Sequence, residues 1–167
     1  MSALPLDPPG AAPLARVPMH LAHLGAVLAI EQVVYAFPWT HGNFVDSLAA
    51  GHHAHVLRAA DGALAGYSVA MAGVQEMHLL NLTVSPSWQR RGLAIALLDA
   101  LLTQCRRQGS EALWLEVRIS NERARAVYAR YGFAEVGLRR GYYPAPGGRR
   151  EDACVMRLGV GRADGTA

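Results

Sequence analysis

A chain of 167 residues has room for one hydrophobic core and one catalytic unit. Hydrophobic residues make up 51% of the chain and charged residues 17%, which is typical of soluble globular proteins and excludes the disordered and fibrous classes. The net charge of +3 suits an anionic cofactor but is too small for a nucleic-acid-binding surface. Because the chain has arginines but no lysine, a Schiff-base lysine, a P-loop lysine and pyridoxal phosphate attachment are excluded as well.

The chain opens on a proline- and alanine-rich segment, residues 1–18, which we expect to be a flexible extension or a short leader into a first strand. Prolines interrupt this segment, and it lacks a basic region followed by a continuous apolar run, so it predicts neither a secretory signal nor a membrane span. We therefore expect a cytoplasmic protein. Its single domain is predicted over residues 19–160, followed by a tail over residues 161–167.

The first half of the domain is predicted to contain two helices and then three strands. Apolar residues at helical spacing indicate a helix over residues 20–35 and, after a turn, a short second helix within residues 37–51. Asp61 and Gly62 then form the strongest short hairpin signal in the chain. The strands around this turn and the next apolar run form an antiparallel group: residues 53–60, 63–73 and 76–84.

In the second half of the domain, strands alternate with helices. A helix over residues 91–109 and another over residues 121–132 each end at a glycine, and a strand over residues 112–118 separates them. The first helix therefore forms a βαβ crossover, which makes its two strands parallel. Strands over residues 133–143 and 151–160 complete an α/β layered fold, in which a mixed sheet has an antiparallel N-terminal half, a parallel crossover and helices on both faces.

The turn into the helix at residues 91–109 is a candidate anion site, with the sequence QRRGLA from Gln89 to Ala94. A helix N-terminus presents unpaired N–H groups and the positive end of the helix dipole. Gly92 lets the backbone approach an anion closely, and Arg90 adds positive charge. A tight turn flanked by solvated arginines explains the same residues, so both interpretations stay open. Neither GxGxxG nor GxxxxGK[ST] is present, which excludes dinucleotide and P-loop sites of those types.

Several motifs in this order resemble the GNAT superfamily of acetyl-coenzyme A dependent N-acetyltransferases. The superfamily signature Q/R-x-x-G-x-G/A matches QRRGLA, and LWLEVR and NERARAVYARYGF follow it. YAFPW near the start and GYYPAPGGRREDACVM near the end are similar to RimI-type ribosomal-protein-alanine N-acetyltransferases, so the resemblance extends over roughly residues 21–158. It implies a GNAT fold, acetyl-coenzyme A as cosubstrate, and direct transfer to the N-terminal alanine of a ribosomal protein of the S18 type.

The resemblance also implies which residues contact acetyl-coenzyme A. A strand segment matches the backbone that pairs with the pantetheine arm, the turn matches the pyrophosphate loop, and an asparagine matches a further contact. These residues are Leu82, Thr83, Val84, Arg90, Arg91, Gly92, Leu93, Ala94, Ile95 and Asn121. Ala94 stands where the family often has glycine. An ordinary buried strand and a helix N-cap at Asn121 explain part of this set equally well.

Glu116 and Tyr128 match the general base and the general acid of the family. Glu116 lies in an otherwise apolar strand, where a carboxylate must be paired or protonated, so a salt bridge to an arginine is the alternative. Tyr128 lies seven residues after Asn121, hence on the same helix face. Packing in the core is the alternative for this tyrosine, and Tyr131, three residues later, is easily confused with it.

Other reactive residues give weaker signals. His52, His53 and His55 have no fourth partner at recognisable spacing, so we expect no metal site. Cys105 and Cys154 lie in apolar runs, which favours two buried, reduced thiols over a disulfide or a nucleophile.

The segment from Tyr142 to Asp152 bears on the acceptor. By resemblance, Tyr142 and Tyr143 help to enclose the acceptor peptide, and Glu151 and Asp152 complete the pattern, with hairpin-edge charges as an equal alternative. We expect the acceptor to be a protein N-terminus, with no nucleic acid or membrane as partner, and a monomer or weak dimer. A GNAT enzyme for small amines or lysine side chains, a coenzyme A binding module without catalysis, and a scaffolding protein are the alternatives.

Overall fold

The computed structural model describes residues 13–161, so part of the expected N-terminal extension and most of the expected C-terminal tail lie outside the described residues. Seven strands form one mixed sheet in the order β1-β2-β3-β4-β5-β7-β6. The described chain divides into two compact units, the first with residues 13–71 and 81–100 and the second with residues 72–80 and 101–161. None of the described helices has the length and apolar character needed to cross a membrane.

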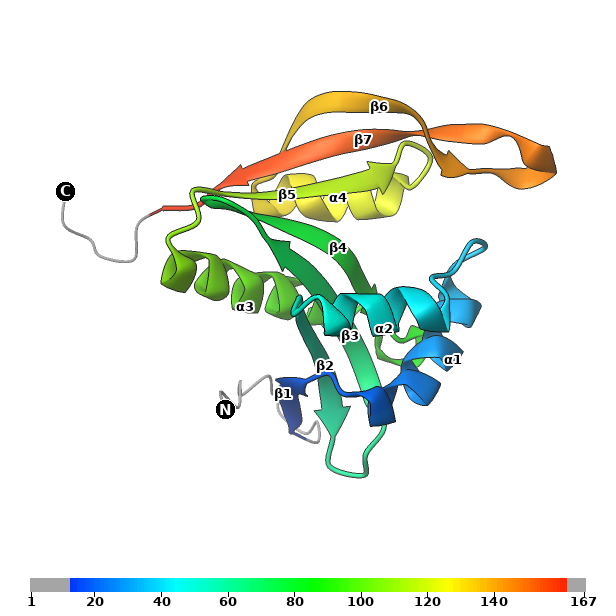
Figure 1. Cartoon of the computed structure of the whole chain (residues 1–167), viewed down its shortest axis with the longest axis vertical. Coiled ribbons are helices and arrows are strands. Elements are labelled where there is room, and N and C mark those ends of the chain that lie inside the picture. The colour runs from blue at the N-terminus through cyan, green and yellow to red at the C-terminus, as the bar shows by residue number, and fades with distance from the viewer. Residues whose placement is uncertain (1–12, 162–167) are drawn as a thin grey trace. The chain divides into compact units, whose positions relative to one another are not determined.

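The first unit contains the N-terminal strands and helices (Figure 1). Its elements are β1 (Leu14–Pro18), a 3-10 turn (Leu21–His23), α1 (Leu24–Val34), α2 (His41–Ala49), β2 (His53–Ala59), most of β3 (Leu64–Ala72), the C-terminal half of β4 (Glu76–Val84), a 3-10 turn (Pro86–Trp88) and the first half of α3 (Leu93–Gln108). β1 pairs with β2, and β2 with β3, in antiparallel register. The predicted helices and strands of this half are therefore confirmed.

Two local contacts define the ends of elements in this unit, and the turn at Asp61 and Gly62 was predicted from the sequence, whereas the cap at Thr40 was not. Gly62 has φ = 91° in the β2–β3 turn, and the Asp61 carboxylate accepts a hydrogen bond from the Ala63 N–H at 2.9 Å. Thr40 caps α2, because its hydroxyl accepts from the Asn43 N–H at 3.1 Å while the Asn43 side chain accepts from the Thr40 N–H at 2.9 Å. The first contact lies in the turn that leads into β3, and the second fixes the start of α2.

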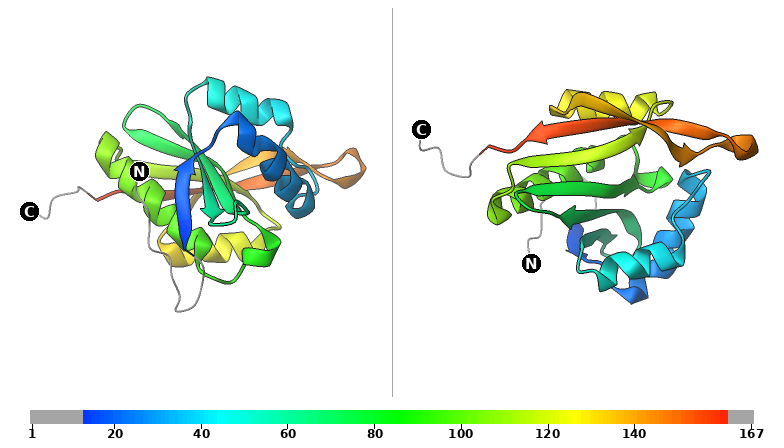
Figure 2. Two further views of the ribbon diagram at one scale, coloured as in Figure 1. Left: turned by 90° about the horizontal axis from the view of Figure 1, so that it is seen from below. Right: turned by 45° about the horizontal axis from the view of Figure 1, so that its top comes forward.

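Residues 14–18 were expected to belong to a flexible extension or to a short segment that leads into the first strand. They instead form β1, an edge strand that pairs with β2 (Figure 2). Only Leu14 of its five residues is buried, so the strand lacks the apolar alternation by which sequence patterns are recognised. Leu14 joins a core cluster of the first unit. The cluster contains Leu14, Leu57, Ala59, Ala65, Leu93 and Leu97, with Leu82, Val84 and Trp88 packed against it.

The second unit contains the crossover strands and a long hairpin (Figure 1). Its elements are the N-terminal half of β4, the second half of α3, β5 (Ala112–Arg118), α4 (Glu122–Tyr131), β6 (Ala134–Pro144), a 3-10 turn (Pro146–Gly148) and β7 (Arg150–Gly159). β4 and β5 are parallel, as the crossover predicted, with pairs that run from Glu76 and Ala112 to Leu79 and Leu115. β7 is antiparallel to both β5 and β6.

The helix ends and the buried face of this unit also follow the sequence pattern. Gly109 ends α3 with φ = 71° and Gly132 ends α4 with φ = 127°, conformations that favour glycine. Alternation along β5 buries Leu113, Leu115 and Val117 and leaves the residues between them partly accessible. Cys105 and Cys154 are both buried and free, as predicted.

Candidate functional site

A turn with left-handed backbone leads into α3 in the first unit. Arg90 has φ = 64° and Gly92 has φ = 76°, and the carbonyl of Gly92 accepts the first helical hydrogen bond, from the Ala96 N–H at 3.1 Å. A Cβ atom at Gly92 would meet no atom within 4 Å apart from those of its neighbours in the chain. The glycine is therefore required by the backbone conformation, and the space before the helix N-terminus is open.

The N-terminus of α3 has the features of an anion site. The N–H groups of Leu93, Ala94 and Ile95 belong to the first helical turn, which has no preceding turn to accept their hydrogen bonds. The guanidinium of Arg91 lies 4.9 Å from the centre of the Trp88 ring, which holds positive charge beside this turn. The geometry fits a bound diphosphate. Leu93, by contrast, turns its side chain into the core, so only its backbone is available to a ligand.

The predicted pantetheine segment, Leu82–Val84, also lies in the first unit. Its side chains are already engaged: Leu82 and Val84 pack against the core cluster, and the Thr83 hydroxyl donates to the Asn81 side chain at 2.7 Å. Gly66 on β3 permits a close approach, because a Cβ atom there would lie 2.6 Å from the Thr83 carbonyl oxygen. This arrangement favours ligand contacts to the backbone of the segment, although the side chains of Leu82 and Val84 are only partly buried.

A buried glutamate behind this segment was missed by the sequence analysis. Glu31 on α1 is 1% exposed, and its carboxylate accepts hydrogen bonds from the Tyr67 hydroxyl at 2.6 Å, the Asn81 side chain at 3.0 Å and the Trp39 N–H at 2.9 Å. Burial and the contact with Glu31 raise the pKa of the Tyr67 hydroxyl. The available signal was an acidic residue inside the apolar run AVLAIEQVV, which pattern reading alone does not connect to partners on distant strands.

Tyr35 extends this network to the strand. Its hydroxyl lies 2.8 Å from the Thr83 hydroxyl and donates to the Leu82 carbonyl at 3.3 Å. Burial raises the pKa of Tyr35 to about 12, so the hydroxyl stays protonated at neutral pH and remains a donor. The end of α1 is thus tied to the strand segment that was predicted to contact acetyl-coenzyme A.

Glu116 belongs to the second unit and has two charged or polar neighbours. Its side chain is 6% exposed, and one carboxylate oxygen, Oε1, lies 3.1 Å from Nε of Arg139. The other oxygen, Oε2, contacts Nε2 of His78 on β4. The salt bridge to an arginine that was the alternative for Glu116 is therefore present. His78 was missed, because its contact depends on the register of β4 against β5.

Asn121 and Tyr128 lie on α4, also in the second unit. The side chain of Asn121 accepts from the Ala124 N–H at 3.1 Å, so it is the N-cap that the alternative interpretation described. The Tyr128 ring lies 5.6 Å from the Phe133 ring in an edge-to-face contact, and the Tyr131 ring lies 6.2 Å from the same ring. Both tyrosines therefore pack on one phenylalanine, and packing does not distinguish them.

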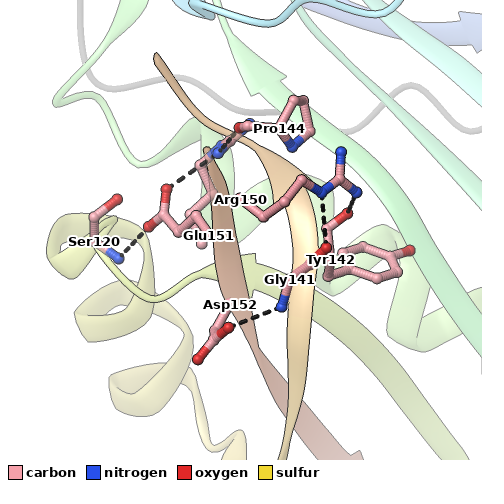
Figure 3. Close-up of polar contacts among 8 residues, drawn as sticks. Ser120, Gly141, Tyr142, Pro144, Arg150, Glu151 and Asp152 are labelled. Atoms are coloured by element: carbon pink, nitrogen blue, oxygen red, sulfur yellow. Dashed lines mark hydrogen bonds and ion pairs between the residues drawn. The ribbon is translucent and has the colours of Figure 1, made fainter. Parts of the chain in front are cut away.

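Charged side chains hold the β6–β7 hairpin to the end of β5. Arg118 donates from Nη1 to the Pro144 carbonyl at 2.7 Å and to Oε1 of Glu151 at 3.1 Å. The Ser120 N–H donates to Oε2 of Glu151 at 2.9 Å (Figure 3). These contacts, with Ser120 first, lower the pKa of the Glu151 carboxyl. Glu151 thus connects the hairpin to the loop that follows β5.

The hairpin contains a break in register between Arg139 and Tyr143. At the break, Gly141 has φ = 60°, its N–H donates to the Asp152 carboxylate at 2.8 Å, and its carbonyl accepts from Nε of Arg150 at 2.9 Å (Figure 3). Side chains therefore replace the backbone hydrogen bonds that the register break removes. Glu151 and Asp152 both stabilise the hairpin, as the alternative interpretation of these two residues expected.

The two tyrosines beside this break lie over arginines. The centre of the Tyr142 ring is 5.6 Å from Cζ of Arg139, and that of Tyr143 is 4.5 Å from Cζ of Arg118. Burial, followed by the charge of Glu116, raises the pKa of Tyr142. Because Arg139 contacts both Tyr142 and Glu116, the hairpin is connected to the predicted base.

His55 on β2 has an arginine as its neighbour. Nδ1 of His55 lies 3.0 Å from a guanidinium nitrogen of Arg16. Burial, followed by the charge of Arg16, lowers the pKa of His55 to about 4. Within residues 13–161 the structure has no cluster of three or more His, Cys, Asp or Glu side chains placed to hold a metal ion.

The chain belongs to the acetyltransferase (GNAT) family, whose sequence model matches residues 24–133. Among individual proteins, it is 38% identical to the [ribosomal protein bS18]-alanine N-acetyltransferase of Escherichia coli strain K12 over 82% of this chain and 91% of that protein. The crystal structure of the E. coli ribosomal-protein-S18-alanine N-acetyltransferase has a TM-score of 0.81 at 35% identity, over 92% of this chain and 98% of that one. Ard1 from Thermoplasma volcanium has a TM-score of 0.80 at 25% identity, over 89% and 99%. The predicted GNAT resemblance and fold are confirmed.

Proposed function

We propose that the chain transfers the acetyl group of acetyl-coenzyme A to the N-terminal α-amino group of a protein, and that the acceptor is the N-terminal alanine of a ribosomal protein of the bS18 type. The observation that carries this proposal is the 38% identity to the E. coli bS18-alanine N-acetyltransferase, which extends over 91% of that relative. Family membership supports acetyl-coenzyme A as the donor.

The turn before α3 and the segment Leu82–Val84 are assigned to the donor. The open space at Gly92 and the first N–H groups of α3 support a pyrophosphate site between Arg90 and Ile95. The engaged side chains of Leu82–Val84 support a backbone contact to the pantetheine arm, and the same backbone offers N–H donors to the thioester oxygen. Asn121 contributes as a cap that fixes the start of α4 and, by resemblance, as a contact to coenzyme A.

Glu116 and Tyr128 are assigned to the movement of protons. Glu116 accepts the proton of the acceptor amine, directly or through another group, and the amine nitrogen attacks the thioester carbonyl. Tyr128 protonates the departing sulfur. The transfer is direct, so the chain forms no covalent bond to the acetyl group. The two contacts of Glu116, to Arg139 and to His78, support its role as an oriented carboxylate.

The acid–base chemistry of amines favours an N-terminus over a lysine side chain. The reference pKa is ~8 for an α-amino group and ~10.4 for lysine, which makes the α-amino group easier to deprotonate by about 3 kcal/mol. When both amines reach the site equally, the α-amino group is therefore the better acceptor. We place the reaction in the cytoplasm and the chain as a monomer or weak dimer, as the sequence predicts.

The acceptor is tested by mass spectrometry of three candidates incubated with acetyl-coenzyme A. The first is a peptide that begins with alanine in the sequence context of a bS18-type protein and contains one lysine. The second is the same peptide with a blocked N-terminus, and the third is a small polyamine. We expect one acetyl group, on the α-nitrogen of the first peptide alone. Acetylation of the blocked peptide would assign the activity to lysine, and acetylation of the polyamine alone would assign it to small amines.

Gly92→Asp is expected to weaken the binding of acetyl-coenzyme A by about 1–2 kcal/mol, or roughly tenfold, because it places a negative charge at the N-terminus of α3. The matched control is Gly92→Asn, whose side chain has the same size and tolerates a positive φ but carries no charge. Calorimetric titration measures both affinities. Equal affinities of the two variants would mean that the turn does not bind an anion.

A further inference from the structure

We infer that His78 is the group that takes the proton from the acceptor amine, and that Glu116 acts through it. The inference rests on the proposed function and assigns a further catalytic residue to the same reaction. It begins from the contact between Nε2 of His78 and Oε2 of Glu116, which joins two neighbouring strands of the second unit.

Strand register brings the two side chains together. His78 lies opposite Trp114 in the parallel β4–β5 pairing, and Leu79 lies opposite Leu115. Glu116 follows Leu115 directly, on the same face of β5 as Trp114. The histidine and the glutamate therefore share one sheet face, on two neighbouring strands. This placement follows from the strands themselves, so it does not depend on a loop conformation.

The accessible partner of this pair is the histidine. The side chain of Glu116 is 6% exposed and that of His78 is 25% exposed. Both carboxylate oxygens of Glu116 are occupied, one by Arg139 and the other by His78. Among residues 13–161, none hydrogen-bonds the second ring nitrogen of His78, Nδ1. An amine that enters the site therefore reaches an unoccupied imidazole nitrogen before it reaches a free carboxylate oxygen.

An imidazole also suits this proton better than a carboxylate does. The reference pKa of imidazole side chains is ~6.5, close to the ~8 of an α-amino group, whereas that of glutamate side chains is ~4.3. A carboxylate that contacts one ring nitrogen orients the ring, fixes its tautomer and stabilises the imidazolium after the proton arrives. Arg139 on β6 contacts Glu116 and keeps the carboxylate oriented, and the hydroxyls of Tyr142 and Tyr143 on the same strand lie close enough to interact with the charge of Glu116.

The proton and bond changes balance in this scheme. The ammonium form of the acceptor gives its first proton to Nδ1 of His78, which later passes it to solvent. The nitrogen then forms its bond to the acetyl carbon while the bond from that carbon to sulfur breaks. Tyr128 gives a proton to the sulfur and is restored by the second proton that the nitrogen loses. One acetylated amine, one thiol and one solvent proton result.

The test measures peptide acetylation by three variants: His78→Gln, Glu116→Gln and the double variant. Glutamine keeps a hydrogen-bonding side chain at residue 78 but cannot take the proton. We expect His78→Gln to lower kcat by roughly 10²-fold or more, with the affinity for acetyl-coenzyme A and the melting temperature close to those of the parent. Because the pair acts as a unit, the double variant should lose no more than the more impaired single variant.

A second measurement distinguishes a role of His78 in proton transfer from a purely structural role of its side chain. His78→Ala should regain part of its activity when free imidazole is added, because imidazole supplies the missing proton acceptor. The control is Tyr131→Phe, which should show no response to imidazole.

Three results would overturn the inference: parental turnover in His78→Gln, losses that multiply in the double variant, or an effect on the peptide KM alone. Failure of the proposed function gives a different result, since the parent chain would then acetylate no peptide at its N-terminus.

Discussion

Tyr128→Phe should lower kcat for N-terminal acetylation by ~10² to 10⁴ if protonation of the sulfur limits the reaction, because a general acid contributes a factor of that size. Phenylalanine keeps the ring that lies 5.6 Å from the Phe133 ring and removes only the hydroxyl. The melting temperature and the affinity for acetyl-coenzyme A should therefore change little. Steady-state kinetics on the alanine peptide, with thermal melting on the same sample, measure these quantities.

Tyr131→Phe is the matched control for this experiment. Tyr131 lies on the same helix, and its ring is 6.2 Å from the same phenylalanine, so the substitution makes the same chemical change in a similar setting. It should leave kcat unchanged. If Tyr131→Phe alone is impaired, the alignment of α4 onto the family motif is wrong. If both variants turn over like the parent, solvent protonates the sulfur and Tyr128 has a packing role.

Glu31→Leu should reduce the free energy of unfolding by about 3–5 kcal/mol, because it removes the acceptor of three hydrogen bonds and leaves their donors unpaired. The donors belong to Tyr67, Asn81 and Trp39, and Glu31 itself is 1% exposed. Urea unfolding at neutral pH measures the change, which should appear in the midpoint with the m-value unchanged. Glu31→Gln should cost less, since its amide oxygen still accepts.

Glu122→Leu is the control for the loss of a glutamate as such. Glu122 is an exposed residue in the first turn of α4, so its replacement should leave the unfolding midpoint close to that of the parent. A midpoint for Glu31→Leu that also equals the parent's would mean that the buried network contributes no net stability.

Elements that depend on local pattern were predictable from the sequence. The crossover from β4 through α3 to β5 follows from apolar runs bounded by turn residues, and its parallel pairing follows because a helical connection returns the chain to the end of the sheet where the first strand began. Gly109 and Gly132 end their helices because the backbone there is left-handed. β1 was not recognised as a strand, because one buried leucine is too weak a pattern to distinguish a short edge strand from an extension.

Side-chain partners were much less predictable. The sequence indicated that the Glu116 carboxylate either pairs with an arginine or acts as the catalytic base. The chain has 16 arginines, and the local sequence pattern does not show that Arg139 is the partner. His78 lies 38 residues before Glu116, and the two meet only through strand register. Glu31 is 36 residues from Tyr67 and 50 from Asn81. Contacts across such separations depend on the fold, which is why the roles of the site residues stay predictions that the variants above test.

The register break in the β6–β7 hairpin separates the tip of the hairpin from the rest of the sheet. The tip closes on itself through the Ala145 N–H, which donates to the Arg149 carbonyl at 2.9 Å, and positive φ angles at Gly147 and Gly148 turn the chain. Below the tip, Asp152 anchors the Gly141 N–H, while β7 keeps its own pairing with β5. A change in the length or composition of the tip should therefore leave the pairing of β7 with β5 in place.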